Sequence, residues 1–381
     1  MSGNKVIVFG SGMVGSAIAA DLSKKFRVTL ADIDLNRALK VKEKNPGIEI
    51  LQLDVNDSMA LKSSLSSMDL VVSAVPGFLG FKALRRVIEA GMSVVDISFC
   101  PENTLDLNSL AIEKNVTAFV DSGIAPGMDN LFLGYHNKRM EITHFECLVG
   151  GLPKIKKWPF YYKAPFSPVD VIEEYTRPVT YIEDGKRTEC EPLEDSELIE
   201  FRETGKLEAF LTDGLRSIIS TMPHIGHMKE KTLRYPGHAD LIRALKAGGF
   251  FSREQVNING SKVTPFEVTA RILLDAWKLE EGEEDITVMR VLIKGKDKSG
   301  KSVEVIYDLF DEYSKETGTT SMARTTGYTA GAVASLFLEG YFSDKGIFPL
   351  EIAGEHEDVF RYVLDYHKSR GVIFRMSEKA V

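Results

Sequence analysis

From Lys5 to Val120 the chain alternates short, apolar, β-rich runs with longer amphipathic stretches. This pattern is typical of a parallel sheet in which helices connect successive strands and cover both faces. Six runs have the composition of strands, and they span residues 5–9, 27–31, 49–53, 70–74, 93–97 and 117–120. Helices are expected between them, starting near Met13, Asp34, Asp57, Phe78 and Asn103. We therefore predict an α/β fold with a Rossmann-type, doubly wound parallel sheet in this part of the chain.

A glycine-rich turn follows the first predicted strand and opens the first predicted helix, and it reads Gly10-Ser11-Gly12-Met13-Val14-Gly15. This is the context that a G-x-G-x-x-G nucleotide-binding turn requires. Gly10 would make the tight turn, Gly12 would let a pyrophosphate approach the backbone, and Gly15 would let the helix pack on the strand. The anion would lie at the helix N-terminus, where unpaired N–H groups and the helix dipole favour negative charge. All six residues are therefore candidate cofactor contacts.

Asp32 ends the second predicted strand, about 20 residues after this turn. A carboxylate there can accept hydrogen bonds from both ribose hydroxyls of NAD, and its charge would repel the 2′-phosphate of NADP. NAD is therefore the predicted cofactor, although Arg37 is close enough in sequence to weaken the preference. Ligands of such sheets bind at the carboxyl ends of the strands, so the next loops supply further cofactor candidates, Asp54, Val55, Ala74, Val75 and Pro76. For Asp54, an ordinary strand-to-helix turn is an equal alternative.

Beyond the sixth predicted strand the pattern changes. A long β-like run over residues 142–149 is followed by the turn dipeptides Asp184-Gly185 and Ser299-Gly300, which are typical of hairpins. Residues 326–340 and 355–368 have the patterns of two helices, which are expected to pack on the first domain because the ends of an inserted domain commonly lie close together. The predicted organisation is a dinucleotide-binding domain over 1–121, an inserted mixed α/β substrate and dimerisation domain over 122–320, and C-terminal helices over 321–381.

The bulk composition excludes several classes of protein. The net charge of −8 gives no positive field for nucleic acid, and no apolar run approaches the ~20 residues needed to cross a bilayer. Cys100, Cys147 and Cys190 are far apart, which suits a reducing compartment and predicts neither a zinc site nor disulfides. His224 and His227 lack a third ligand at an informative spacing, so no metal is predicted. The N-terminus lacks the pattern of a signal peptide, and we expect a cytoplasmic protein.

Several segments are together similar to the saccharopine dehydrogenase-like family across nearly the whole chain. They are the glycine-rich turn, Val95-Asp96-Ile97-Ser98-Phe99, Asp121-Ser122-Gly123-Ile124-Ala125-Pro126-Gly127-Met128-Asp129-Asn130, Gly150-Gly151-Leu152-Pro153 and Thr326-Gly327-Tyr328. Residues 150–178 and 233–238 most resemble the L-lysine 6-dehydrogenase branch. The resemblance implies NAD-dependent conversion of lysine to 2-aminoadipate 6-semialdehyde plus ammonia, with Ser98 among the cofactor contacts. It also implies subunits that pair through the second domain, and hence a homodimer or higher homo-oligomer.

Two departures separate this chain from the saccharopine-forming branch. Ala125 stands where that branch usually has an acidic residue, and Val149 stands where it has cysteine. Both changes remove polar groups from the expected cleft, which favours a small amino-acid substrate. Saccharopine dehydrogenase and carboxynorspermidine dehydrogenase-like enzymes stay open as alternatives. A non-catalytic NAD-binding protein that kept the fold is the alternative from another class.

Oxidation of a C–NH₂ group requires a neutral amine, and a free lysine ε-amine has a pKa of about 10.4. A general base within hydrogen-bond reach must therefore take a proton. The candidates follow a turn, lie in the lysine-dehydrogenase-like segment, or end strands on the cofactor side, and they are His238, Tyr162, Lys163, Asp96 and Asp121. Their plain alternatives are a surface histidine, an aromatic beside a solvated cation, and caps of the following turns.

Two arginines could hold the α-carboxylate of an amino acid, because a guanidinium can donate two parallel hydrogen bonds to it. They are Arg177 and Arg234, and a surface ion pair is the alternative for each. Glu173 and Glu174 could hold the α-ammonium, but only one of two neighbours on a helix can face a site. Glu174 is taken as the candidate.

Overall fold

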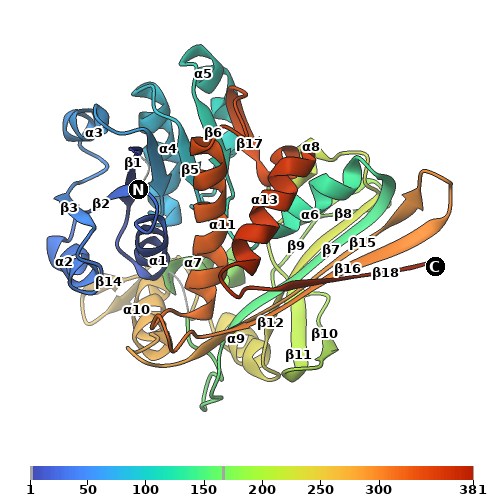
Figure 1. The fold of residues 1–381 in the computed structure, drawn as a ribbon. Helices are drawn as coiled ribbons and strands as arrows, with labels where there is room; N and C mark the ends of the chain where they lie inside the picture. The colour runs from blue at the N-terminus through green and yellow to red at the C-terminus, as the bar shows by residue number, and fades with distance from the viewer. Residues whose placement is uncertain (1–2, 165–167, 381) are drawn as a thin grey trace.

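The computed structural model describes residues 3–164 and 168–380. Its first sheet has seven parallel strands in the order β17-β6-β5-β4-β1-β2-β3 (Figure 1). The strands are β1 (Lys5–Phe9), β2 (Arg27–Asp32), β3 (Glu49–Gln52), β4 (Leu70–Ser73), β5 (Val94–Asp96), β6 (Thr117–Val120) and β17 (Gly346–Pro349). The strand order reverses at β1, which is where such sheets bind ligands. The predicted Rossmann-type fold is confirmed, and β17 is an additional strand that the sequence did not predict.

Helices connect these strands at the predicted places. They are α1 (Met13–Leu22), α2 (Leu35–Lys44), α3 (Ser58–Leu65), α4 (Gly77–Glu89), the 3₁₀ turn η1 (Thr104–Leu107) and α5 (Asn108–Glu113). Asp34 and Asp57 cap α2 and α3, because each side chain accepts hydrogen bonds from backbone N–H groups of the first turn. Asn103 caps η1 in the same way, so the expected helix starts are confirmed and side-chain caps account for three of them.

The second sheet has nine strands and is mixed, with most pairs antiparallel. Its strands are β7 (Met140–Pro153), β8 (Val179–Glu183), β9 (Lys186–Cys190), β10 (Glu197–Phe201), β11 (Gly205–Leu211), β12 (His227–Arg234), β15 (Asp285–Asp297), β16 (Ser302–Glu312) and β18 (Phe374–Ala380). Asp184-Gly185 joins β8 to β9 and Ser299-Gly300 lies between β15 and β16, so both predicted hairpins form. A further hairpin pairs β13 (Val256–Ile258) with β14 (Ser261–Val263).

The remaining helices are α6 (Met128–Asn137), α7 (Pro168–Thr176), α8 (Ile218–Thr221), α9 (His238–Ala247), α10 (Pro265–Trp277), α11 (Ser321–Leu338), α12 (Leu350–Ala353) and α13 (Glu357–Lys368). The start of α11 precedes the expected start at residue 326. Thr320 caps the helix locally by accepting from the N–H of Ala323, and the carboxylate of Asp285 accepts hydrogen bonds from the N–H groups of Ser321 at 2.7 Å and Met322 at 3.0 Å. This long-range cap has no local sequence pattern.

The C-terminal segment, predicted as helices that return to the first domain, contributes to both halves. Helix α11 packs on α1, and β17 extends the first sheet beside β6. Strand β18 instead pairs with β16 at an edge of the second sheet. Both strands were missed, because β17 is only four residues long and β18 is a mostly polar, exposed run. The domain boundaries at 121/122 and 320/321 stay predictions.

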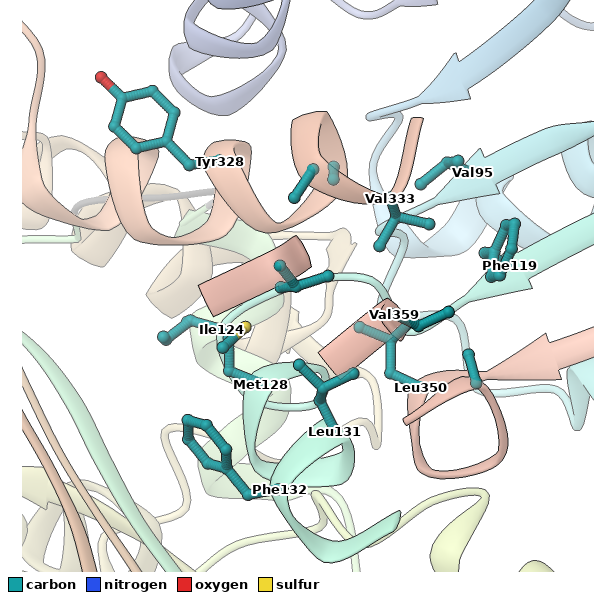
Figure 2. Packing of buried hydrophobic residues seen from close by; sticks show 14 of the residues in the cluster. Val95, Phe119, Ile124, Met128, Leu131, Phe132, Tyr328, Val333, Leu350 and Val359 are labelled. Atoms are coloured by element: carbon teal, nitrogen blue, oxygen red, sulfur yellow. The ribbon is translucent and has the colours of Figure 1, made fainter. Parts of the chain in front are cut away.

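One hydrophobic core runs between the two halves. Figure 2 shows Val95 and Phe119 of the first sheet, Leu131 of α6 and Val333 of α11 in the same cluster. Helix α6 follows directly from β6 and leads into β7, so it carries the chain from one sheet to the other. The carboxyl edge of the first sheet is thereby held against the second half of the protein.

Candidate active site

The glycine-rich turn has the geometry of a nucleotide-binding turn. Gly10 has φ +92°, and a Cβ on it would lie 2.5 Å from the carbonyl oxygen of Ala74. A Cβ on Gly15 would lie 2.0 Å from the carbonyl oxygen of Gly10, so both positions need glycine. At Gly12, by contrast, a Cβ would meet no described atom within 4 Å, and α1 starts there without a side-chain cap. The open N–H groups of the first turn of α1 fit a pyrophosphate.

Asp32 lies at the end of β2 beside this turn, and Ser11 holds its carboxylate. Oδ2 accepts hydrogen bonds from the N–H of Ser11 at 2.6 Å and from its hydroxyl at 2.7 Å, while Oδ1 accepts one from the N–H of Asp34 at 2.8 Å. Arg37 pairs with Asp34 at 3.3 Å and its side chain is 70% exposed. The carboxylate is therefore oriented by the backbone, and Arg37 is engaged elsewhere.

The other predicted cofactor contacts lie where β3, β4 and β5 end. Val75 is buried in the turn after β4, and Pro76 starts α4. Ser98 is buried and donates both its N–H and its hydroxyl to Asp96. Asp54 is exposed, and its side chain accepts a hydrogen bond from the N–H of Asn56. This contact belongs to an ordinary strand-to-helix turn, the alternative role expected for Asp54. Cofactor contact by these residues stays a prediction.

Asp96 and Asp121 lie at the carboxyl ends of β5 and β6, as expected, and the structure adds Arg216 beside them. Burial raises the pKa of Asp96 to about 7, with the nearby Asp121 adding to the shift while the hydroxyl of Ser98 opposes it. Arg216 Nε donates to Asp121 Oδ1 at 2.8 Å, and its Nη1 donates to the carbonyl of Cys100 at 2.6 Å. Asp121 is thus held in a buried ion pair, whereas Asp96 can change protonation near neutral pH. Sequence reasoning missed Arg216, which lies in a loop without a motif.

Arg177, at the end of α7, reaches the same edge of the sheet. Its guanidinium stacks on the ring of Phe99 at 4.9 Å, and Arg216 stacks on that ring at 4.8 Å. The nearest carboxylates, on Glu173 and Asp213, are each 3.9 Å away, which is too far for a hydrogen bond. Arg177 makes no side-chain hydrogen bond to the side chains and backbone that the structure describes, and its side chain is 16% exposed. Its donors are therefore available to a carboxylate ligand.

Arg234, the second predicted carboxylate binder, is occupied. It is 2% exposed, and its Nε donates to the hydroxyl of Tyr175 at 2.9 Å. Its Nη2 donates to Glu174 at 2.5 Å, and the guanidinium stacks on Tyr162 at 4.4 Å. The geometry does not support Arg234 as a substrate contact, and it gives Glu174 the role of counter-ion. Burial also raises the pKa of the Tyr162 hydroxyl well above its usual range, which does not suit a base.

His238 is fully buried, and both of its ring nitrogens have partners. Nδ1 lies 2.8 Å from the carbonyl oxygen of Phe160, and Nε2 lies 2.9 Å from the hydroxyl of Tyr175. Because a carbonyl can only accept, Nδ1 carries the proton and Nε2 accepts from Tyr175. Burial, reinforced by the charge of Arg234, lowers the pKa of His238 to about 3. The proposed role of general base is not supported by this geometry. Lys163 is also engaged by the backbone, because its Nζ donates to the carbonyl oxygen of Lys278 at 2.9 Å.

The sequence-predicted residues thus fall into two clusters that α7 connects. Asp96, Ser98, Asp121 and Arg177 meet at the carboxyl edge of the first sheet. The second cluster lies inside the second half and consists of Tyr162, Glu174, Arg234 and His238. The described residues contain no group of three or more histidine, cysteine, aspartate or glutamate side chains that could hold a metal ion. The described helices include none that is long and apolar enough to cross a membrane.

The fold and the glycine-rich turn define the class of protein, a two-domain oxidoreductase fold with a pyridine-nucleotide-binding sheet. Comparison with known families finds the saccharopine dehydrogenase NADP binding domain over residues 6–119 and the saccharopine dehydrogenase C-terminal domain over residues 123–372. The chain belongs to the saccharopine dehydrogenase family.

Curated relatives are distant in sequence but similar in extent. Saccharopine dehydrogenase [NADP(+), L-glutamate-forming] of Schizosaccharomyces pombe is 23% identical over 90% of this chain and 92% of its own length. Carboxyaminopropylagmatine dehydrogenase of Synechocystis sp. is 22% identical over 91% of this chain and 92% of its own. Among solved structures, apo saccharopine dehydrogenase (L-Glu forming) from Saccharomyces cerevisiae superposes with a TM-score of 0.80 at 20% identity and covers both chains fully. That likeness shows the shared fold.

Proposed function

We propose that this protein is an NAD-dependent dehydrogenase that acts on the CH–NH₂ group of an amino acid, and that its substrate is L-lysine. The products would be 2-aminoadipate 6-semialdehyde and ammonia. The observation that carries the proposal is the Arg177 guanidinium, which stacks on Phe99 at the carboxyl edge of β5 with no hydrogen-bonded partner in the described chain. Such a group can bind the α-carboxylate of an amino acid with two charge-assisted hydrogen bonds.

The cofactor proposal rests on Gly12 and Asp32. The open space at Gly12 and the uncapped start of α1 fit a pyrophosphate, and Asp32 fits the adenosine ribose. When bound, the nicotinamide cofactor would accept the hydride from the substrate carbon. The name of one relative given above includes NADP(+). The proposed preference of this protein for NAD therefore depends on the charge of Asp32, which would repel a 2′-phosphate.

Two positions that the family resemblance assigns to the substrate cleft are apolar, which supports a small substrate. Ala125 packs against the main hydrophobic cluster, and Val149 belongs to it. Neither side chain can pair with a carboxylate. An amino acid with a single carboxylate and an unbranched amine leaves fewer buried polar groups without partners than a substrate built from two amino acids. This supports lysine over saccharopine.

A secondary amine is the second candidate substrate class. It is supported by the relatives, one named as a saccharopine dehydrogenase and one as a carboxyaminopropylagmatine dehydrogenase. A protein that binds NAD without turnover is a third reading, because function lies in sites rather than in folds.

A substrate panel with purified enzyme separates the three. We expect reduction of NAD with L-lysine alone. If turnover requires saccharopine or another secondary amine, that amine and not lysine is the substrate. Tight NAD binding without turnover on any amine would support the non-catalytic reading.

Two further proposals concern the state of the protein in the cell. We propose a homodimer or larger homo-oligomer that pairs through the second domain, because the family resemblance implies such pairing and apolar strand runs such as residues 286–293 need a covered face. A monomeric mass by light scattering at micromolar concentration would refute this. The three cysteines are free, which suits a reducing compartment, and we propose that the protein is cytoplasmic.

A further inference from the structure

Glu230, in β12, is a buried carboxyl group that the proposed function has not used. It is 6% exposed, and its Oε2 is buried without a hydrogen-bond partner in the described part of the chain. Buried polar atoms are nearly always bonded, so an unbonded carboxyl oxygen is costly and calls for an explanation. A purely structural residue at this position would be better replaced by an apolar one.

The carboxyl of Glu230 lies against the segment that builds the candidate site. A Cβ on Gly214 would lie only 1.0 Å from Glu230 Oε2, so the carboxyl fills the space that a side chain there would take. The residue before Gly214 is Asp213, which faces Arg177 at 3.9 Å, and two residues after it comes Arg216, which binds Asp121. The carboxyl of Glu230 therefore lies against the segment that carries these charged side chains, and the charges of Asp213 and Arg216 act on it.

The other carboxyl groups of this region are bonded. Asp96 accepts two hydrogen bonds from Ser98, Asp121 is paired with Arg216, and Asp129 accepts one from the N–H of Gly127 at 2.8 Å. In contrast to these three carboxyl groups, Glu230 has a buried oxygen, Oε2, that has no hydrogen-bond partner among the described residues. It can therefore take up a proton or a cation without breaking an existing hydrogen bond.

Resting on the proposed function, we propose that Glu230 is the general base of the reaction. Its carboxylate receives one proton from the ammonium group of the bound substrate, so that the N–H bond breaks, a carboxyl O–H bond forms, and the substrate is left as the neutral amine. The step moves one proton and no electrons, and it needs no further reactant. It requires the backbone at Gly214 to shift when substrate binds, so that the carboxyl is uncovered while Arg216 stays paired with Asp121.

The surroundings set the pH range in which Glu230 ionises. Burial raises its pKa well above the usual value, and nearby carboxyls raise it further while one guanidinium lowers it. The charged and titratable groups that face it come from α6, α7, the segment after β11 and β7, and they are Asp129, Glu174, Asp213, Arg216 and Cys147. Turnover should therefore rise with pH, as Glu230 loses its proton.

The test compares Glu230→Gln with Glu208→Gln in the full-length enzyme. Glu208 is a buried glutamate on the adjoining strand β11, but its carboxylate is bonded to Ser196 at 2.7 Å and paired with Arg243 at 3.3 Å. We expect Glu230→Gln to lower kcat by about 10²- to 10⁴-fold and to abolish the rise of kcat with pH. Its Tm and its NADH binding, followed by fluorescence, should match wild type. Glu208→Gln should lower Tm and leave kcat within about twofold of wild type.

Each outcome decides the matter. Glu230→Gln with near-wild-type kcat and an unchanged pH profile overturns the inference. Loss of folding or of NADH binding also overturns it, because both assign Glu230 a structural role. Glu230→Asp, which keeps a shorter carboxyl, should retain a pH-dependent kcat between those of wild type and Glu230→Gln. If wild type itself turns over no amine, the proposed function fails, and that result is read before any variant is compared.

Discussion

Two regions share one edge of the first sheet, yet they are built in different ways. One is the nucleotide-binding turn, and the other is the group of polar side chains around Phe99, made by Asp96, Asp121, Arg177 and Arg216. The turn is six consecutive residues, and two of its glycines, Gly10 and Gly15, are required by contacts with each other and with Ala74. The group around Phe99 joins side chains from separate segments, and its ion pair links Asp121 to Arg216, 95 positions away. Local backbone geometry therefore fixes the first region, and long-range packing of charges fixes the second.

The largest expected effect comes from breaking the long-range region at Arg216. Arg216→Met would leave the buried carboxylate of Asp121 unpaired, which should lower the free energy of unfolding by about 3–5 kcal/mol. Denaturation with urea measures this. The matched control is Arg290→Met, whose pair with Asp308 is 29% and 41% exposed and should contribute less than about 1 kcal/mol. Equal losses of unfolding free energy in the two variants would show that the buried pair of Arg216 with Asp121 stabilises the protein no more than an exposed pair does.

Arg177→Met should separate function from stability. Its guanidinium has no hydrogen bond in the free protein, so the free energy of unfolding should change by less than about 1 kcal/mol. The kcat/KM for lysine should fall about 10²-fold, or about 3 kcal/mol, through loss of two charge-assisted bonds to the carboxylate. Steady-state kinetics with urea denaturation checks both. A variant that loses stability but keeps kcat/KM would make Arg177 a structural residue.

A smaller effect is expected in the local region, at Asp32. Asp32→Ala removes the charge that repels a 2′-phosphate, so the ratio of kcat/KM for NAD over NADP should fall by about tenfold, or about 1.4 kcal/mol. The same substitution at the neighbouring Asp34, which pairs with Arg37, should change the ratio much less. Equal use of both cofactors by wild type would contradict the assignment.

The smallest effect concerns His238, which lies in the buried cluster with Tyr162 and Arg234 and not at the carboxyl edge of the first sheet. His238→Gln should keep kcat near that of wild type. Because burial lowers the pKa of His238 from 6.5 to about 3, the unfolded chain takes up the proton first as the pH falls. The stability advantage of wild type over the variant should be complete well above pH 6.5 and shrink by about 1.4 kcal/mol per pH unit between pH 6.5 and the folded pKa of about 3. An advantage that stays constant down to pH 4, or a large loss of kcat, would show that His238 is not a neutral structural residue.

Sequence patterns predicted the parts of this protein that depend on neighbouring residues. The six strands, the helix starts near Asp34 and Asp57 and both hairpin turns follow from periodicity and turn chemistry. Strands β17 and β18 were missed because short or polar strands form only when a partner strand is present. The same limit applies in part to the start of α11, where the distant Asp285 adds hydrogen bonds to the local cap made by Thr320.

The candidate site was predictable only in part. Asp96 and Asp121 could be placed, because the ends of parallel strands meet at one edge. Arg234 and His238 flank the turn at residues 235–237, but their side chains point into the interior, where hydrogen bonds to Tyr175 occupy them. Arg216 and Glu230 have no motif, and their roles follow from residues that only the fold brings next to them.

The central claim is that the enzyme oxidises the side-chain amine of lysine. Its most direct test is turnover of L-lysine labelled with ¹⁵N at the ε-nitrogen, with NAD and no second amino acid, followed by isotope analysis of the ammonia. The account predicts one labelled ammonia for each NADH formed. Unlabelled ammonia would place the reaction at the α-amine, and no ammonia without a second substrate would place it at a secondary amine, and either result would contradict the account.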